Sequence, residues 1–391
     1  MTLTGRDIVC VGFADWETDL RTNQHHLMSR LAATNRVLFI ESLGLRRPQL
    51  VGRDVRRIAR RVLRGLRGAR AIDDLHVLSP LVVPRHDRLW AQRINGWLLP
   101  RLVGASARRL GLHAPILWGY VPQAQALIDV LSPSLVVYHC VDDIAATKGI
   151  DAESFRSAER SFAGRADLVL ASSRPLAERM RELSDHVLEV PNVADTRRFA
   201  TALESGPVDE GMQALSRPTI VFTGAVVATK LDVALLVELA GRRPGWSFAL
   251  VGPVGVGDPR TDVSALAHLP NVHLLGARPY HALPAVLRGA DAAVIPYAVN
   301  QLTASIFPMK VYEYLAAGLG VVATPLPSLA EVEGIETAAD AGAMAACLTA
   351  LIDEDSPERR AQRSRLAAGH SWDARLEEIG QAVDAVEPTR R

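Results

Sequence analysis

The sequence is poor in cysteine, has no long apolar run and carries little net charge. Its three cysteines, Cys10, Cys140 and Cys347, lack the spacing of metal ligands, so we expect a reducing compartment and no disulfide framework. No apolar run approaches the roughly 20 residues of a membrane-spanning helix, and the first residues lack a signal-peptide pattern. We therefore expect a cytoplasmic protein, with attachment to the inner face of the membrane as the alternative left open. The formal net charge of +1 gives no bulk electrostatic reason to expect nucleic acid as a partner.

One segment breaks this charge balance. Residues 46–70 hold ten arginines against a single acidic residue, Asp54. Apolar residues recur at helical spacing between the arginines, which predicts a basic amphipathic helix in contact with an anionic membrane surface. The alternatives are a solvated helix whose apolar stripe packs on its own domain, and nucleic-acid binding, for which the segment lacks interleaved aromatic residues. The arginines expected at the membrane are Arg53, Arg56, Arg57, Arg60, Arg61, Arg64 and Arg67.

Strand and helix patterns alternate in both halves of the chain. Short continuous apolar runs separated by helical patterns predict parallel sheets covered on both faces. The rhythm is lost at 201–217 and then restarts, so we expect two doubly wound, Rossmann-like α/β domains, 1–200 and 218–370, with 201–217 as their linker. Open parallel sheets bind ligands at the carboxyl ends of their strands, so a cleft between the domains is the default site.

The most informative stretch is residues 305–324, whose pattern predicts a loop, a two-turn helix, a glycine stop and a buried strand. Lys310 and Glu313 stand three residues apart and therefore on one face of the predicted helix. Gly318 ends that helix. Helix amides, a cation and a carboxylate together suit the phosphates and the ribose hydroxyls of a nucleoside diphosphate. An ordinary surface helix after a loop is the alternative.

A second basic group follows the strand predicted at 219–224. The sequence has only three lysines, Lys148, Lys230 and Lys310, and Lys230 lies six residues after Gly224. A lysine ammonium is a compact point charge on a flexible stem and suits a phosphate. Lys230 is therefore a candidate phosphate ligand, with a solvated lysine at a helix start as the alternative.

Taken in order, these features resemble the GT-B glycosyltransferases of the retaining family 4 type over about 160 residues. Three short motifs are most similar to the teichuronic-acid-type transferases of that group, which build cell-surface glycans. The resemblance implies an N-terminal acceptor-binding domain, a C-terminal donor domain and a closing helix, 371–391, that packs back on the N-terminal domain. The residues that carry the resemblance are 190–195, 220–224 with Lys230, 248–252, 269–276, 290–297, 305–324 and 371–372, and the three motifs are 138–143, 300–303 and 308–310.

The resemblance also implies roles for single residues. Lys230 would hold the donor diphosphate and stabilise the leaving group, and Glu313, the second glutamate of an E-x7-E motif, would accept from the ribose hydroxyls. The loop 305–309 would give backbone N–H groups to phosphate or sugar, and Arg278 would lie near the nucleobase. The implied donor-binding residues are Gly224, Lys230, Arg278, Asn300, Thr303, Ser305, Phe307, Lys310 and Glu313.

The sequence departs from the family in its C-terminal half. The first glutamate of E-x7-E falls at Ser305, so the family's usual grip on the donor sugar is missing. We predict that Lys310 contacts the donor phosphate or a negatively charged sugar, and that Asn300 or Thr303 contacts sugar hydroxyls. Local pairing of Lys310 with Glu313 is the alternative.

The N-terminal half departs as well. The family's glycine-rich loop is replaced by the stretch from Gly12 to Trp16, and the nearest candidates for its histidine are His139 and Asp142. The resemblance implies that Gly12, Trp16 and His139 face the acceptor or the sugar. Asp142 joins Lys230 and Glu313 as a catalytic candidate.

No metal is expected in such a site. Asp142 and Asp143 lack the D-x-D spacing of metal-dependent transferases, and helix dipole and basic side chains can stabilise a departing diphosphate. His25 and His26 are expected on the surface of the first helix.

We therefore expect an enzyme that moves a hexose from a nucleotide-diphosphate sugar to a hydroxyl of a glycan or lipid-linked acceptor in cell-surface polysaccharide synthesis. Retention is implied by the resemblance, and no cofactor is expected. A GT-B nucleotide-sugar epimerase remains an alternative, although it gives no reason for the basic segment. A non-catalytic nucleotide-sugar-binding or assembly protein is the other alternative, suggested by Ser305.

Overall fold

The computed structural model describes residues 3–18, 21–43, 68–80, 89–147, 149–256, 258 and 260–387. The contacts divide the chain into two compact units. The first unit comprises Met1–Pro191 and Leu376–Arg391, and the second unit comprises Asn192–Arg375. The arginines from Arg53 to Arg67, on which the expected membrane helix depends, lie outside the described residues.

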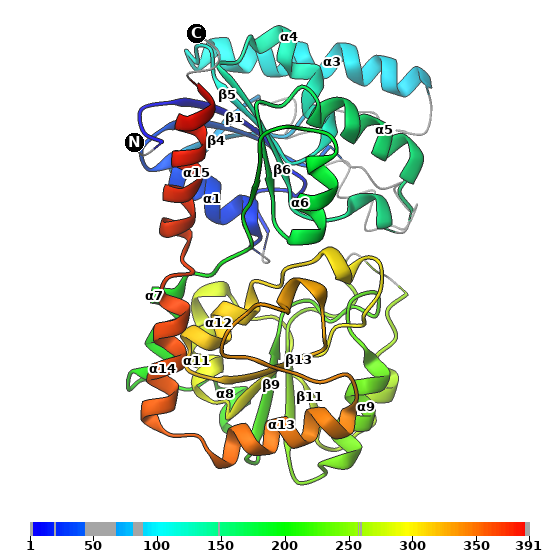
Figure 1. Cartoon of the computed structure of the whole chain (residues 1–391), viewed down its shortest axis with the longest axis vertical. Coiled ribbons are helices and arrows are strands. Elements are labelled where there is room, and N and C mark those ends of the chain that lie inside the picture. The colour runs from blue at the N-terminus through cyan, green and yellow to red at the C-terminus, as the bar shows by residue number, and fades with distance from the viewer. Residues whose placement is uncertain are drawn as a thin grey trace. The chain divides into compact units, whose positions relative to one another are not determined.

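The first unit is built on an eight-stranded sheet with the order β3-β4-β2-β1-β5-β6-β7-β8 (Figure 1). All neighbouring strands are parallel except β3 and β4. Its strands are β1 (Asp7–Val11), β2 (Arg36–Ile40), β3 (Arg70–Ile72), β4 (Leu75–Leu78), β5 (Ile116–Gly119), β6 (Leu135–Cys140), β7 (Leu168–Ala171) and β8 (Val187–Glu189). Its helices are α1 (Asn23–Ala32), α3 (Leu89–Arg109), η1 (Pro122–Leu127), α4 (Ile128–Leu131), η2 (Ile144–Ala146), α5 (Ala152–Ala163) and α6 (Arg174–Arg181).

The second unit is built on a six-stranded parallel sheet with the order β11-β10-β9-β12-β13-β14. Its strands are β9 (Thr219–Thr223), β10 (Ser247–Val251), β11 (Val272–Leu274), β12 (Ala292–Ile295), β13 (Gly320–Ala323) and β14 (Glu336–Thr337). Its helices are α7 (Thr196–Ala200), η3 (Thr201–Leu203), α8 (Glu210–Gln213), α9 (Val233–Arg242), α10 (Ser264–Ala267), η4 (Tyr280–Ala282), α11 (Leu283–Arg288), η5 (Thr303–Ser305), α12 (Lys310–Ala316), η6 (Pro327–Leu329), α13 (Ala341–Asp353) and α14 (Pro357–Ala368). Helix α15 (Trp372–Val386) starts in the second unit and continues in the first.

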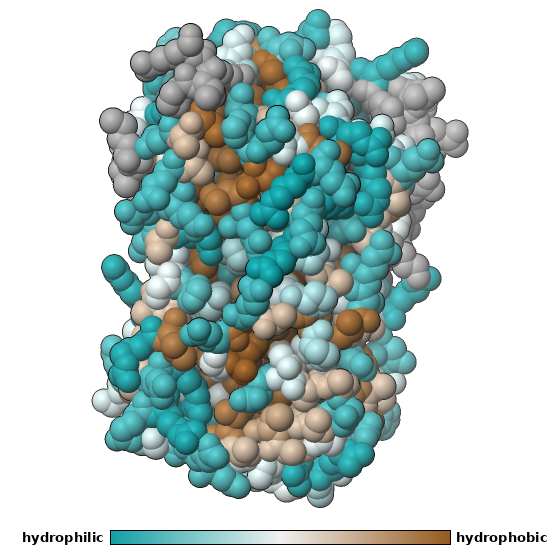
Figure 2. All heavy atoms as spheres, viewed as in Figure 1, coloured by the Kyte–Doolittle hydropathy of each residue, from teal (hydrophilic) through white to brown (hydrophobic). Residues whose placement is uncertain are grey.

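Continuous apolar runs explain the two sheets. Every residue of β7, β9, β10, β12 and β13 is buried, as expected of parallel strands covered on both faces. Helices α9 and α13 pack on each other, while α12 contacts α7 and α14, and both α12 and α13 contact β13. On the face drawn in Figure 2, hydrophilic residues predominate and hydrophobic residues form smaller patches. The expected fold class, two Rossmann-like α/β sheets, is confirmed.

The boundary between the units differs from the expected linker at 201–217. This stretch belongs to the second unit, where the Arg288 guanidinium donates to the backbone carbonyls of Thr201, Glu204 and Pro207. Met212 is buried in the core of that unit. The backbone of this stretch is held by hydrogen bonds from Arg288 on α11. It can therefore pack on the second unit without a periodic run of apolar residues, and its sequence shows no such period.

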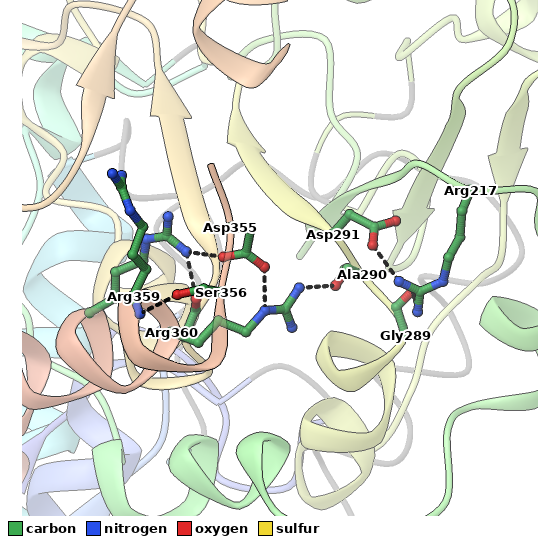
Figure 3. A network of polar contacts seen from close by, with 10 residues as sticks. Arg217, Gly289, Ala290, Asp291, Asp355, Ser356, Arg359 and Arg360 are labelled. Carbon is green, nitrogen blue, oxygen red and sulfur yellow. Dashed lines mark hydrogen bonds and ion pairs between the residues drawn. The ribbon is translucent and has the colours of Figure 1, made fainter. Parts of the chain in front are cut away.

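A polar network ties α14 to the amino ends of β9 and β12 (Figure 3). Asp291 pairs with Arg217 and accepts from the backbone N–H of Thr219 at 2.7 Å. Arg360 of α14 pairs with Asp355 at 2.6 Å and donates to the carbonyl of Ala290 at 3.4 Å. These contacts lie at the amino ends of the strands, opposite the carboxyl edge at which open parallel sheets bind ligands.

The described residues hold no helix with both the length and the apolar content that a membrane span requires. The surface position expected for His25 and His26 is wrong, because both are buried on the inner face of α1. The His25 ring contacts the backbone N–H of Thr22 at 3.1 Å and the carbonyl of Asp15 at 3.0 Å, and burial lowers its pKa.

Candidate functional site

Two glycines shape the carboxyl edge of the second unit's sheet. Gly224 follows β9 with a φ of +124°, which L side chains rarely adopt. Its N–H donates to the carbonyl of Val251 at 2.9 Å. A Cβ at Gly252 would lie 1.9 Å from the Gly224 carbonyl oxygen. The turns after β9 and β10 therefore pack so closely that their backbones touch and no side chain fits between them.

Lys310 reaches this turn from the start of α12. Its Nζ donates to the hydroxyl of Tyr297 at 2.9 Å and lies 5.2 Å from the ring centre of Phe222. A Cβ placed on Gly224 would lie 3.4 Å from this Nζ. Burial lowers the pKa of Lys310, but Tyr297, Tyr314 and Glu313 outweigh burial, so the pKa is raised overall. Lys310 is therefore a partly buried cation at the carboxyl end of β9, and its hydrogen bond goes to Tyr297 rather than to Glu313.

Glu313 lies one helical turn after Lys310, and only 7% of its surface is exposed. Within the described residues its carboxyl has no hydrogen bond or ion pair. Burial raises its pKa to about 7; Lys310 lowers the pKa and Asp195 raises it further. A buried carboxyl without a donor is costly in a folded protein. It can accept hydrogen bonds from the hydroxyls of a ligand.

Lys230 stands beside the same segment as Lys310. Its carbonyl accepts from the backbone N–H of Ala298 at 2.9 Å, and Leu231 forms an antiparallel bridge with Tyr297. Within the described residues the Lys230 ammonium has no hydrogen bond or ion pair. Two lysines thus contact the Tyr297–Ala298 segment after β12: the tyrosine holds Lys310, and the Lys230 ammonium is unpaired among the described residues. Together they provide positive charge for an anionic ligand.

The polar side chains of the loop after β12 form hydrogen bonds within that loop. Thr303 is fully buried, and its hydroxyl donates to the carbonyl of Ala298. The Asn300 side-chain oxygen accepts from the backbone N–H groups of Leu302 (2.9 Å) and Thr303 (3.0 Å). Both side chains build the turn, as Asn and Thr often do after a strand, and a contact of either with sugar hydroxyls stays a prediction.

The next residues of this loop are also part of the packing. The Phe307 ring is buried and stacks on Tyr312, with 5.7 Å between ring centres. Its carbonyl accepts from the Asn192 side chain at 2.9 Å. A ligand contact by Phe307 therefore has to use its backbone. Ser305 ends η5 and is partly buried.

The Arg278 side chain, predicted to lie near the nucleobase, is held by partners within the second unit. Its Nε donates to Asp209 at 2.7 Å, and its Nη1 donates to the carbonyl of Leu275 at 2.7 Å. Asp209 in turn caps α8 through the backbone N–H groups of Gly211 and Met212. The guanidinium is used to hold α8 against the sheet, and the pKa of Asp209 is lowered by this pairing.

In the first unit, Gly12 and Trp16 are parts of the interior. A Cβ at Gly12 would lie 2.4 Å from the Phe39 ring, so this glycine permits close packing. Trp16 is 6% exposed, and its backbone N–H donates to Glu41 at 3.0 Å. The Trp16 side chain is buried and Gly12 has none, so the acceptor contact predicted for these two residues stays a prediction that concerns their backbone.

His139 and Asp142 lie at the carboxyl end of β6. The His139 ring is buried and stacks on Tyr120, with 4.8 Å between ring centres. Asp142 is partly buried in the following turn, where its carbonyl accepts from the N–H of Ile144. The neighbouring Asp143 pairs with Arg156 and Arg179, so its carboxylate is already neutralised.

Tyr297 is the site residue to which the sequence analysis gives no role. It holds Lys310 through its hydroxyl, and its ring centre lies 5.1 Å from the Lys310 Nζ. Its position directly after an apolar strand, at the carboxyl edge of a parallel sheet, is the signal that could have indicated it. The described residues contain no group of three or more His, Cys, Asp or Glu side chains arranged to hold a metal ion.

Residues 217–354 match the family model of the glycosyl transferases group 1. This range contains the site residues of the second unit, Gly224, Lys230, Tyr297, Lys310 and Glu313. With its two Rossmann-like units the chain has the GT-B fold, and it is a glycosyltransferase that depends on a nucleotide sugar.

Individual relatives extend the similarity beyond this domain. The chain is 27% identical, over 95% of both chains, to TuaH of Bacillus subtilis (strain 168), which carries the name of a teichuronic acid biosynthesis glycosyltransferase. Among solved structures, sucrose-phosphate synthase from Thermosynechococcus elongatus superposes with a TM-score of 0.69 at 15% identity, over 98% of this chain and all of that one. HepE of Anabaena, solved in complex with UDP-glucose, superposes with a TM-score of 0.66 at 13% identity, over 97% of this chain and all of that one. Because the sequence identities to the solved structures are low, these superpositions show a shared fold only.

Proposed function

We propose that the second unit binds a nucleoside-diphosphate hexose at the carboxyl edge of its sheet. The observation that carries this proposal is the buried Glu313 carboxyl, which has no hydrogen-bond donor among the described residues and lies one turn from Lys310. In the proposed complex the ribose hydroxyls donate to Glu313, and the diphosphate lies between Lys310 and Lys230. The solved HepE structures, which hold UDP and UDP-glucose, support uridine diphosphate as the first nucleotide to test.

The proposed reaction transfers the hexose to a hydroxyl of the acceptor. The bond from the anomeric carbon to the diphosphate breaks, and the acceptor oxygen forms the new bond to that carbon on the same face, which retains its configuration. A departing phosphate oxygen takes the acceptor proton. Lys230 and Lys310 stabilise the charge that develops on the diphosphate, so we propose that neither a metal nor another cofactor takes part. The Lys230 ammonium, which has no partner among the residues that the structure describes, can approach the leaving group as the charge grows.

The proposed acceptor is a glycan or a lipid-linked glycan in cell-surface polysaccharide synthesis. The similarity to TuaH, whose name refers to teichuronic acid biosynthesis, supports this class of product. The ten arginines of residues 46–70 support a site of action at an anionic membrane surface, where lipid-linked acceptors reside.

A ligand screen followed by a transfer assay tests this proposal. Nucleoside diphosphates that bind the folded state raise the melting temperature by mass action, and we expect UDP to do so for the wild type but far less for Glu313→Gln. Incubation with UDP-hexoses and a lipid-linked acceptor should then give a glycosylated product and UDP. An exchange of sugar configuration without transfer would identify an epimerase, and the lack of a shift with any nucleoside diphosphate would overturn the proposed donor site.

A further inference from the structure

Helix α3 exposes three large apolar side chains along one face. Trp90, Ile94 and Trp97 are 55%, 43% and 58% exposed. Their spacing of four and three residues places them on one side of the helix, over roughly 10 Å of its length. The opposite side, including Leu99 and Val103, is buried in the first unit. We call Trp90, Ile94 and Trp97 the tryptophan stripe. Figure 1 shows α3 as a long helix at the surface of this unit.

Arginines extend the tryptophan stripe. Arg101 lies a further turn along the same side, with its guanidinium carbon 4.3 Å from the ring centre of Trp97, and Arg93 is exposed beside Ile94. Arg108 and Arg109 form the last turn of α3. The helix contains four arginines and no acidic residue. An apolar stripe on a helix of purely positive charge therefore faces the surroundings of the protein.

This combination fits the interface of an anionic lipid bilayer. Tryptophan has an amphipathic ring that prefers the headgroup level of a membrane, and arginine is attracted to lipid phosphates. Insertion by 5–10 Å of an apolar helix face is the usual depth of such contacts. Each arginine near an anionic surface adds about 1 kcal/mol of attraction. The charge of α3 is complementary to lipid phosphates along its whole length.

A protein partner fits less well. A stable protein interface buries about 800 Å² on each side and needs a complementary shape, whereas the tryptophan stripe is three side chains on one convex helix. A bilayer supplies apolar contact without such complementarity. The stripe contains two indole rings and an isoleucine, and Ile94 offers nothing to a nucleic acid.

We propose that the tryptophan stripe of α3 inserts into the headgroup region of an anionic membrane, with Arg93 and Arg101 at the lipid phosphates. This inference deepens the membrane contact included in the proposed function by naming an apolar anchor among the described residues. Arginines of 46–70 would add a separate electrostatic contact. Two signals of this kind are what stable peripheral binding usually requires.

Vesicle binding of the full chain tests the anchor directly. We expect the wild type to sediment with phosphatidylglycerol vesicles and hardly with phosphatidylcholine vesicles. Trp90→Ala/Ile94→Ala/Trp97→Ala should bind the anionic vesicles at least about tenfold more weakly, because apolar insertion is lost. Arg93→Gln/Arg101→Gln should weaken binding and reduce its dependence on salt. Val256→Ser, which removes a comparably exposed apolar side chain from the second unit, is the matched control and should bind like the wild type.

Fluorescence locates the contact even if the triple variant folds poorly. Lipids brominated near the headgroup should quench the wild type, and Trp90→Phe/Trp97→Phe should still bind but lose that quenching. A UDP thermal shift on each variant separates the membrane contact from donor binding, so a failure of one leaves the other testable. Equal vesicle binding by the wild type and the triple variant would overturn the inference. So would a wild-type dimer, or an RNA complex, that the triple variant abolishes while vesicle binding is unchanged.

Discussion

At the scale of single residues, Glu313 gives the clearest prediction, a dependence of protein stability on pH. Its carboxyl is buried, has no hydrogen-bond donor in the part of the chain that the structure describes, and has its pKa raised from 4.5 to about 7. Between these two values the folded protein holds a proton that the unfolded chain has lost. The unfolding free energy therefore falls as the pH rises through this window, by up to about 1.4 kcal/mol per pH unit. The penalty is fully present above pH 7 and absent below 4.5.

Glu313→Gln should remove this penalty. We expect the variant to be about 1–3 kcal/mol more stable than the wild type at pH 8 and nearly equal to it at pH 4.5, as measured by urea unfolding. The same variant should bind UDP on the order of tenfold more weakly, because a neutral amide replaces a charged acceptor. Exposed Glu178→Gln on α6 is the control and should change neither quantity. A stability difference that is independent of pH would contradict the burial of an uncompensated carboxyl.

Lys230→Ala tests the cation that has no partner within the described residues. If the ammonium stabilises the leaving diphosphate, kcat/KM should fall by about 30- to 1,000-fold, equivalent to about 2–4 kcal/mol of transition-state stabilisation. The melting temperature without ligand should stay unchanged, because this ammonium makes no hydrogen bond or ion pair within the described part of the chain. Thr229→Ala, an exposed neighbour, serves as the control. Near wild-type turnover of Lys230→Ala would remove this residue from the mechanism.

Residue chemistry and spacing pointed to Lys230, Lys310 and Glu313, because each is an unusual charge at a predicted strand end or helix start. They could not indicate the internal hydrogen bonds of Thr303 or the use of Arg278 as a clamp for Asp209. These two arrangements depend on which backbone N–H and C=O groups of a loop lack a hydrogen-bond partner. A periodic sequence pattern does not contain that information.

At the scale of elements, the contact between the turns after β9 and β10 depends on Gly252. A Cβ at this position would meet the Gly224 carbonyl at 1.9 Å, and both partners are backbone. Gly252→Ala should therefore push the two turns apart, cost about 1–3 kcal/mol of stability and weaken UDP binding. Calorimetry and a UDP titration measure the two effects.

Gly241 supplies the matched control for this prediction. It lies in α9 with open space around the position of an added Cβ. Gly241→Ala should raise stability by about 0.5–1 kcal/mol, because alanine loses less entropy in a helix, and it should leave UDP binding unchanged. If both substitutions destabilised the protein equally, the effect would come from replacing any glycine and not from the contact between the two turns.

The elements that could be predicted are those with simple periods. Apolar runs located β9 and β13 within a residue or two. The β3–β4 hairpin and α3 were not predicted. Strands β3 and β4 have three and four residues, too few for a pattern. In α3, apolar residues lie on the exposed side as well as on the buried side, so the hydrophobic contrast that marks a surface helix is absent.

At the scale of the whole molecule, charge is distributed unevenly. The chain has a net charge of +1, yet residues 46–70 contain ten arginines and one acid, so the remaining residues together are negative. We therefore expect residues 46–70 to provide most of the electrostatic attraction to an anionic membrane, beside the contact proposed for α3. Replacing Arg56, Arg57, Arg60 and Arg61 with glutamine should abolish sedimentation with anionic vesicles, since about 4 kcal/mol of attraction is lost.

The control for this prediction replaces arginines elsewhere on the surface. Arg359 and Arg365 are exposed on α14, and their exchange for glutamine should leave sedimentation unchanged. UDP thermal shifts of both variants should equal the wild type. If the wild type does not sediment at low salt, or the quadruple variant sediments equally well, the basic segment has no membrane role.

The first unit is built from two separate segments of the chain, and this has a consequence for folding during translation. Its final portion, from Leu376 onward, includes Glu387, which pairs with Arg6 near β1. The whole second unit is an unbroken segment that separates these two portions. On the ribosome, the second unit can therefore fold as soon as residue 375 has emerged. The first unit must wait in an incomplete form for a helix made after it, so the unit that is translated first is completed last.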